Sequence, residues 1–264
     1  MRRALAPAGR AQPRRDNSAE GGGEYFASMT DLMLGLVFIF VIMLMVLALD
    51  MRQAERRMSE AADAVTQSEL ARSDLLRDLM KVLGSRLPVT IDEDNGTLSL
   101  GGDILFPRGS ADAYPEALPK LMALGEALDR VLPCYSVAPL ARSEIACDRR
   151  HAGRLDAVLI EGHTDATPIK TPRFQSNWEL STARAAAMFA RLGSNFPGLL
   201  ALKNDRGAAL IGVSGYGETR PVDDSGSEMG MQRNRRIELR FVMAAPAASA
   251  ASDVASAVAA ARGR

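Results

Sequence analysis

The sequence predicts an α/β fold in which a four-stranded sheet carries helices on one face, preceded by a single transmembrane helix and a helical stalk. Three observations support this fold class. They are a long apolar run near the start, a stretch without proline that is rich in Ala, Glu, Arg and Leu, and a later alternation of strand and helix patterns. We therefore expect a disordered tail, a membrane span, a stalk, an α/β domain and a second disordered tail, at residues 1–24, 25–49, 50–87, 88–243 and 244–264.

The overall charge gives no sign of a nucleic-acid partner. The 264 residues include 32 Lys and Arg against 32 Asp and Glu, so the formal net charge is zero. Nucleic-acid-binding domains usually carry a basic excess, and we expect no such partner here. Both tails are built from residues that cannot bury a core, Arg with Gly and Pro in the first and Ala with Ser in the second, and we expect both to be disordered.

The predicted span at residues 25–49 has Asp31 as its only ionisable side chain apart from the phenol of Tyr25. At about 1.5 Å per residue the span covers about 37 Å, enough to cross a hydrocarbon core of about 30 Å. A cleaved signal peptide would have a shorter apolar region and a small-residue cleavage site. We therefore expect an uncleaved membrane anchor.

The basic residues around the span predict its orientation. Five arginines precede it and favour a cytoplasmic N-terminus, although three more follow its far end, at positions 52, 56 and 57. In this orientation residues 50–264 lie outside the cytoplasm, in the periplasm if the protein sits in a Gram-negative inner membrane.

Asp31 has two interpretations. It either caps a helix that starts at Leu32, or it lies inside the membrane and carries an ion. A helix starting at Tyr25 places Asp31 about 9 Å along the helix axis. A carboxylate inside the bilayer costs on the order of 2.5 to 3.5 kcal/mol, so it should face a partner or a wet path. In the second interpretation the Thr30 hydroxyl helps to coordinate a proton or a sodium ion, and the sequence does not distinguish the two.

Two cysteines, Cys134 and Cys147, lie within one short segment. Outside the cytoplasm such a pair favours a disulfide, which would contribute about 3 kcal/mol for a loop of this length. The alternative is a zinc site that adds His151 and Asp148, but it lacks a C-x-x-C pair.

Residues 50–87 have no proline and one glycine, and their apolar residues recur at helical spacing. They form either a single amphipathic stalk or a parallel coiled-coil dimer, whose seam would be interrupted at residues 66–68. In the domain that follows, we expect a cap for the second helix at Ser176 or Asn177. The expected strands are 97–106, 157–165, 208–218 and 235–243, and the expected helices are 115–131 and 177–192.

Four motifs in this domain, "EGHTD", "NWELSTARA", "GYGETRPV" and "RNRRIELRF", resemble in order those of the OmpA-like peptidoglycan-binding domain. The resemblance covers residues 96–243 and implies an α/β sandwich that binds the diaminopimelate of the stem peptide. It implies that Asp165 binds the ammonium group and Arg184 the carboxylate. The remaining residues that it places around the pocket are Thr164, Asn177, Leu180, Asn234 and Arg235.

The residues themselves leave alternatives for this site. Asp165 can cap a turn while Arg184 pairs with a surface acid, or Glu161 and His163 can join Asp165 in a metal site. We find no nucleophilic triad and no phosphate-binding glycine loop, so we expect neither an enzyme nor a cofactor.

An early acid in a single span, a stalk and a wall-binding domain together resemble the MotB-type stator family, which includes the flagellar subunit and ZorB of Zorya anti-phage systems. The resemblance implies that Asp31 carries the ion and that a homodimer sits inside five MotA- or ZorA-like subunits. The flagellar pattern reads close to Tyr-Ala-Asp-hydrophobic-Met-Thr-Ala, whereas "SMTDLMLGLVFIF" keeps only Asp31 and Met33. A ZorB-like stator is therefore preferred, and the alternatives are a flagellar stator and a passive tether between membrane and wall.

Overall fold

The computed structural model describes residues 21–137, 147 and 154–244. His151 and Asp148 of the alternative zinc site, and most of both expected tails, lie outside these residues. The chain divides into two compact units, Met1–Ser59 and Glu60–Arg264, which are described separately below.

The first unit consists, in its described part, of the start of helix α1, which runs without a break from Gly21 to Leu83. The expected span 25–49 lies inside this helix. By length and composition, α1 is the one helix among the described residues that can cross a membrane. Because α1 begins at Gly21, Asp31 lies beyond the first turns and does not cap the helix at Leu32.

The second unit contains a five-stranded sheet in the order β1-β2-β5-β3-β4. β3 and β4 are parallel, and the other neighbours are antiparallel. The sequence predicted four strands and missed β1. A strand of three residues, two of them polar, is too short for an alternating pattern. The bounds are β1 Thr90–Asp92, β2 Thr97–Gly101, β3 Leu155–His163, β4 Ile211–Gly215 and β5 Arg236–Met243.

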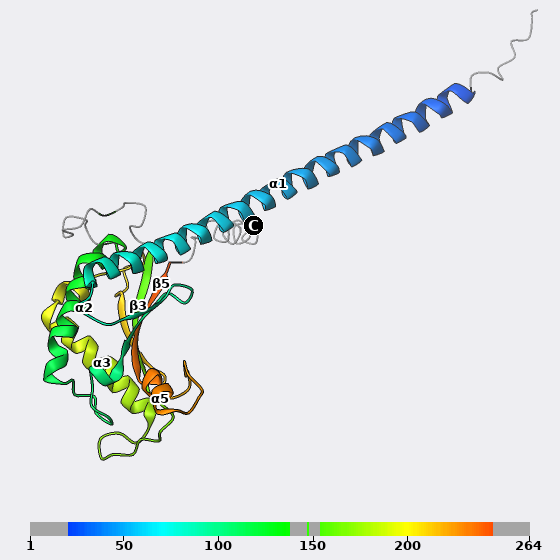
Figure 1. Ribbon diagram of the computed structural model, residues 1–264. Helices are drawn as coiled ribbons and strands as arrows, with labels where there is room; N and C mark the ends of the chain where they lie inside the picture. The colour runs from blue at the N-terminus through cyan, green and yellow to red at the C-terminus, as the bar shows by residue number, and fades with distance from the viewer. Residues whose placement is uncertain (1–20, 138–146, 148–153, 245–264) are drawn as a thin grey trace, which may run out of the picture. The chain divides into compact units, whose positions relative to one another are not determined.

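Helices α2 (Leu118–Val131) and α3 (Asn177–Asn195) lie together on one face of this sheet (Figure 1). Ser176 is the N-cap of α3, and its side chain accepts a hydrogen bond from the backbone N–H of Glu179. The Glu179 carboxylate accepts from the N–H of Gln175, so a reciprocal cap fixes the start of α3. The short helices are α4 Pro197–Leu200 and α5 Glu228–Asn234, and the 3-10 turns are Gly102–Ile104, Pro115–Ala117 and Leu132–Cys134.

The core lies between the sheet and the helices. Alternate residues of the strands point into it, because successive side chains of a strand lie on opposite faces of the sheet. The last turns of α1 belong to the same core, so part of the range 50–87 packs as domain rather than as a free stalk. The core residues from β2, β5, β3 and α1 are Leu98, Leu100, Ile237, Leu239, Phe241, Val158, Ile160, Leu75, Leu76, Leu79 and Leu83.

Two glycines allow α3 to approach the sheet closely. Gly162 and Gly215 are partners on β3 and β4. A Cβ atom on Gly162 would lie 2.1 Å from the backbone oxygen of Ser181, and one on Gly215 would lie 2.2 Å from the Thr182 hydroxyl. The absence of side chains at these two positions places the first turns of α3 against the C-terminal ends of β3 and β4.

Cys134 and Cys147 are joined by a disulfide. The neighbouring Tyr135 donates a hydrogen bond from its hydroxyl to Asp78 of α1 over 3.0 Å. The segment after α2 is therefore held both by the disulfide and by the end of α1.

Candidate functional site

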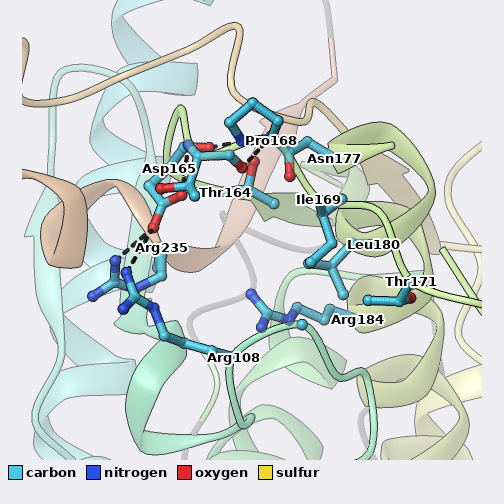
Figure 2. A pocket seen from close by; sticks show the side chains of 12 residues that line it. Arg108, Thr164, Asp165, Pro168, Ile169, Thr171, Asn177, Leu180, Arg184 and Arg235 are labelled. Carbon is cyan, nitrogen blue, oxygen red and sulfur yellow. Dashed lines mark hydrogen bonds and ion pairs between the residues drawn. The ribbon is translucent and has the colours of Figure 1, made fainter. Parts of the chain in front are cut away.

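A cavity of about 320 Å³ opens beyond the C-terminal end of β3 (Figure 2). Its walls come from the loop after β3, the first turns of α3, the loop between β2 and α2, and the residue before β5. The lining residues are Arg108, Gly109, Thr164, Asp165, Thr167, Pro168, Ile169, Thr171, Asn177, Leu180, Arg184 and Arg235. Six of the seven residues that the sequence assigned to a pocket are among them.

Asn234 does not line the cavity. Its side-chain oxygen accepts hydrogen bonds from the backbone N–H groups of Val222 and Asp223, over 2.8 and 3.0 Å, and its amide donates to the Asp223 carbonyl. As the last residue of α5, it fixes the loop that precedes this helix. Asn234 is therefore a loop-binding residue and not the pocket residue that the sequence predicted.

Arg184 is 3 % exposed and reaches the cavity from α3. Its Nε donates to the carbonyl of Ser110 over 2.8 Å, and its Nη2 donates to the carbonyl of Pro107 over 2.9 Å. Burial lowers the pKa of Arg184, yet an arginine keeps its charge at neutral pH. No described residue accepts a hydrogen bond from Nη1. This donor group of the Arg184 cation, whose position is fixed by the other two bonds, is therefore available to a ligand.

Asp165 is 6 % exposed and lies two residues after the end of β3. Its Oδ1 accepts from the backbone N–H of Thr167 over 2.9 Å, and its Oδ2 accepts from Nη1 of Arg235 over 2.5 Å. Burial alone would raise the pKa of Asp165, but these hydrogen bonds outweigh it and hold the pKa below its usual 3.8. The cavity therefore contains a fixed anion at neutral pH.

Arg235 is fully engaged by neighbouring acids. It forms two hydrogen bonds to Asp103, over 2.8 and 2.9 Å, one to Asp165 and one to Glu228 over 3.2 Å. The bonds to Asp103 are the main reason that its pKa is raised. Arg235 thus positions Asp165, and little of its guanidinium remains for a ligand.

Charges of both signs meet at the cavity. Three arginines and one carboxylate, Asp165, line it, and two further carboxylates, Asp103 and Glu228, pair with these arginines from outside the lining. Fixed charges of both signs suit a ligand end that carries both an ammonium and a carboxylate. The Thr164 hydroxyl adds a buried oxygen without a hydrogen-bond partner in the part of the chain that the structure describes. The six charged residues are Arg108, Arg184, Arg235, Asp103, Asp165 and Glu228.

Sequence reasoning missed several residues that line this cavity. The connection that follows Asp165 contributes four of them, Thr167, Pro168, Ile169 and Thr171. Its position beside a proposed site was a usable signal, because binding residues often lie on such loops. Arg108 comes from a loop far earlier in the chain, and no motif marks it.

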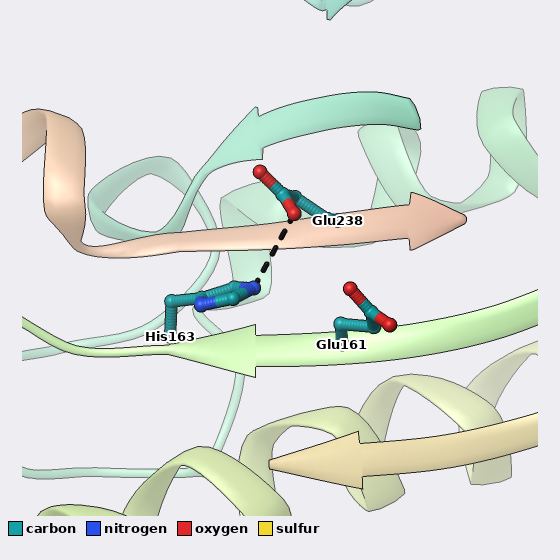
Figure 3. Close-up of side chains that lie close together, drawn as sticks. All are labelled: Glu161, His163 and Glu238. Carbon is teal, nitrogen blue, oxygen red and sulfur yellow. Dashed lines mark ion pairs between the residues drawn. The ribbon is translucent and has the colours of Figure 1, made fainter. Parts of the chain in front are cut away.

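A second cluster of ionisable side chains contains Glu161, His163 and Glu238 (Figure 3). The sequence alternative for a metal site combined Glu161 and His163 with Asp165, but the structure places Asp165 in the cavity instead. All three residues of the cluster are buried. The imidazole Nε2 of His163 lies 3.4 Å from Oε2 of Glu238.

Arginines neutralise both carboxylates of this cluster. Arg240 donates to both oxygens of Glu161 over 3.0 Å, and Nε of Arg236 donates to Oε1 of Glu238 over 2.7 Å. Burial would raise the pKa of Glu238, but the neighbouring His163 and the hydrogen bond from Arg236 hold it at about 2. The cluster is therefore an ion-pair network that links neighbouring strands β3 and β5, with its negative charge already balanced.

Comparison with known proteins relates one part of the chain to a family. Residues 143–235 match the model of the OmpA family. This range contains Asp165, Arg184 and Arg235, whereas Thr30 and Asp31 lie outside it.

The curated relatives are matched over a limited length. Motility protein B of Bacillus subtilis (strain 168) is 42% identical over 82 residues, which are 31% of this chain and 28% of the relative. The sodium-type flagellar protein MotY of Vibrio parahaemolyticus serotype O3:K6 (strain RIMD 2210633) is 35% identical over 95 residues, 36% and 28% of the two chains. The chain thus spans less than a third of the length of these relatives.

Among solved structures, a putative MotB-like protein from Desulfovibrio vulgaris superposes with a TM-score of 0.48 at 20% identity. The superposition covers 70% of this chain and 99% of the other.

Proposed function

We propose that this chain, in which an OmpA-like α/β domain follows an apolar helix, anchors an ion-driven inner-membrane complex to peptidoglycan. The observation that carries the proposal is the cavity in which buried Asp165 and buried Arg184 offer fixed charges of opposite sign. The diaminopimelate side chain of a stem peptide ends in an ammonium and a carboxylate on one carbon, and it matches this pair.

In the proposed complex the ligand carboxylate binds Nη1 of Arg184, and the ammonium binds Asp165. Arg184 is aimed by its bonds to the carbonyls of Pro107 and Ser110, so little rearrangement is needed on binding. The Thr164 hydroxyl, which has no hydrogen-bond partner among the described residues, provides a further polar contact to the bound end.

The membrane part of the proposal rests on Asp31. This carboxylate lies inside an apolar helix and, with Thr30, would bind and release a proton or a sodium ion. The similarity to motility protein B of B. subtilis supports a stator-type role. In this role a homodimer sits within five MotA- or ZorA-like subunits, with its N-terminus in the cytoplasm and its α/β domain in the periplasm.

Among stators, we favour a ZorB-like component of anti-phage defence over a flagellar subunit. The residues around Asp31, "SMTDLMLGLVFIF", lack the Ala-Asp and Met-Thr-Ala contexts of the flagellar pattern. A passive tether, in which Asp31 has no role, is the remaining alternative.

The wall-binding proposal is tested by calorimetric titration of the full chain in detergent with two tripeptides, one ending in meso-diaminopimelate and one in L-lysine. The lysine side chain keeps the ammonium but lacks the carboxylate that Arg184 would bind. We expect the diaminopimelate peptide to bind at least about tenfold more tightly, the effect of one lost charge-assisted contact. Equal affinities, or no binding of the diaminopimelate peptide, would refute the assigned roles.

A further inference from the structure

Arg108 differs from the other two arginines of the cavity in how it is held. Its side chain is 62% exposed, and its guanidinium makes only long ion contacts with the described residues, 3.8 Å to Asp165 and 3.6 Å to Glu228. Both partners of Arg108 already accept hydrogen bonds from Arg235. Its cationic group is therefore weakly committed in this structure.

The backbone around Arg108 is fixed, by contrast. Arg184 donates to the carbonyls of Pro107 and Ser110, on either side of the Arg108–Gly109 pair. Gly109 has a φ of +68°, which glycine adopts without strain, and a Cβ atom there would lie 3.2 Å from Cδ1 of Ile169. The exposed side chain of Arg108 is thus attached to a fixed segment of backbone, and Figure 2 shows it beside Arg235 and Asp165.

The size of the cavity determines how much of a ligand lies outside it. About 320 Å³ is near the lower end of the range for ligand sites, so the cavity holds one amino-acid end of a larger ligand. The rest of that ligand must leave on the open side of the cavity, where the exposed lining residues are Arg108, Thr167 and Pro168. An ammonium bound at Asp165 would also meet the charge of Arg108 at close range, and the two cations would repel each other unless a second anion lay between them.

We propose that Arg108 binds a second carboxylate of the ligand, one that lies outside the cavity and is distinct from the carboxylate bound by Arg184. When the ammonium occupies Asp165, Arg108 turns from Asp165 to this outer carboxylate. The inference rests on the proposed binding of a stem peptide. Where the second carboxyl of diaminopimelate is bonded to the following alanine, the nearest remaining anion along the peptide is the free α-carboxylate of the γ-linked glutamate that precedes it. Arg108 would accordingly discriminate stem peptides with a free glutamate carboxylate from those in which this group is amidated.

The test compares two tetrapeptides in which meso-diaminopimelate is followed by D-alanine amide, one with γ-linked D-glutamate and one with D-isoglutamine, titrated into the full chain in detergent. For the unmodified protein we expect the free acid to bind about two- to fivefold more tightly, as for an exposed ion pair. In Arg108→Gln both peptides should bind with equal affinity, and in Arg108→Lys a part of the preference should remain.

Arg173→Gln is the matched control, because it removes the same charge from an exposed side chain that pairs with Asp112 instead of a cavity residue. This variant should keep the full preference. A preference that survives in Arg108→Gln, or an unmodified protein that binds both peptides equally, would overturn the inference alone. An unmodified protein that binds neither peptide would overturn the proposed wall-binding function and this inference together.

Discussion

Replacing Asp31 with Asn is expected to abolish the ion-driven activity of the complex while leaving the chain inserted in the membrane and bound to the wall. Asn keeps the size of the side chain and its place inside α1, but it cannot take up and release a proton or hold a sodium ion as a carboxylate does. The measurement is the cellular function of the system, phage protection or motility, at matched levels of membrane-inserted protein.

Asp50→Asn is the matched control for this substitution. Asp50 is also exposed on α1, but it lies just past the apolar run. It should therefore tolerate loss of its charge. Full activity of Asp31→Asn would contradict the ion-carrier role and would favour the passive tether. Loss of activity in Asp31→Asn but not in Asp50→Asn would exclude a general effect of removing a charge from the helix.

Arg235→Gln is expected to lower the free energy of unfolding by about 3 kcal/mol. Ligand binding by this variant should be lost at a higher pH than binding by the unmodified protein. Removing one partner of a buried ion pair leaves an uncompensated charge, and such losses are typically about 3 to 5 kcal/mol. The value expected here is at the lower end, since water reaches the Asp103 and Glu228 sides of the network. Chemical denaturation of the full chain measures the stability change.

The pH dependence of this variant follows from Asp165. Its pKa is lowered in the folded protein, so its ion pair contributes stability above pH 3.8, and this contribution is lost as the pH falls through the folded pKa. Without Arg235 the folded pKa of Asp165 rises, so ligand binding, which needs the ionised carboxylate, should begin to fall at a higher pH. The acid-induced loss of stability from this group should become smaller, because the folded and unfolded pKa values lie closer together. Arg233→Gln removes an exposed arginine that pairs with Asp223 outside the cavity, and it should leave the pH profile of ligand binding unchanged.

The strands and helices that build the domain were largely predictable, because apolar residues alternate along β5 and recur at helical spacing in α3. Strand β1 was not, since its pairing depends on β2 and not on a pattern of its own. The extent of α1 was also hidden. Leu75 and Leu79 fit equally well in a free stalk or in the domain core, and only their packing decides this.

The site was predictable where short motifs carried its residues, as for Asp165 and Arg184. Asn234 stands beside Arg235 in the same motif, yet it binds a loop, because neighbouring residues at a helix end point in different directions. Arg108 could not be predicted as a cavity residue, because its contact with Asp165 joins residues more than fifty positions apart in the chain. Tertiary contacts of this kind leave no local signal in a single sequence.

Binding of peptidoglycan through the Asp165–Arg184 cavity is tested by sedimentation of the full chain in detergent with insoluble peptidoglycan. We expect the unmodified protein to sediment with the wall material and the folded variants Asp165→Asn and Arg184→Gln to remain in the supernatant. Arg220→Gln, on a loop outside the cavity, should sediment fully. Retention of wall binding by both cavity variants would contradict binding through this cavity.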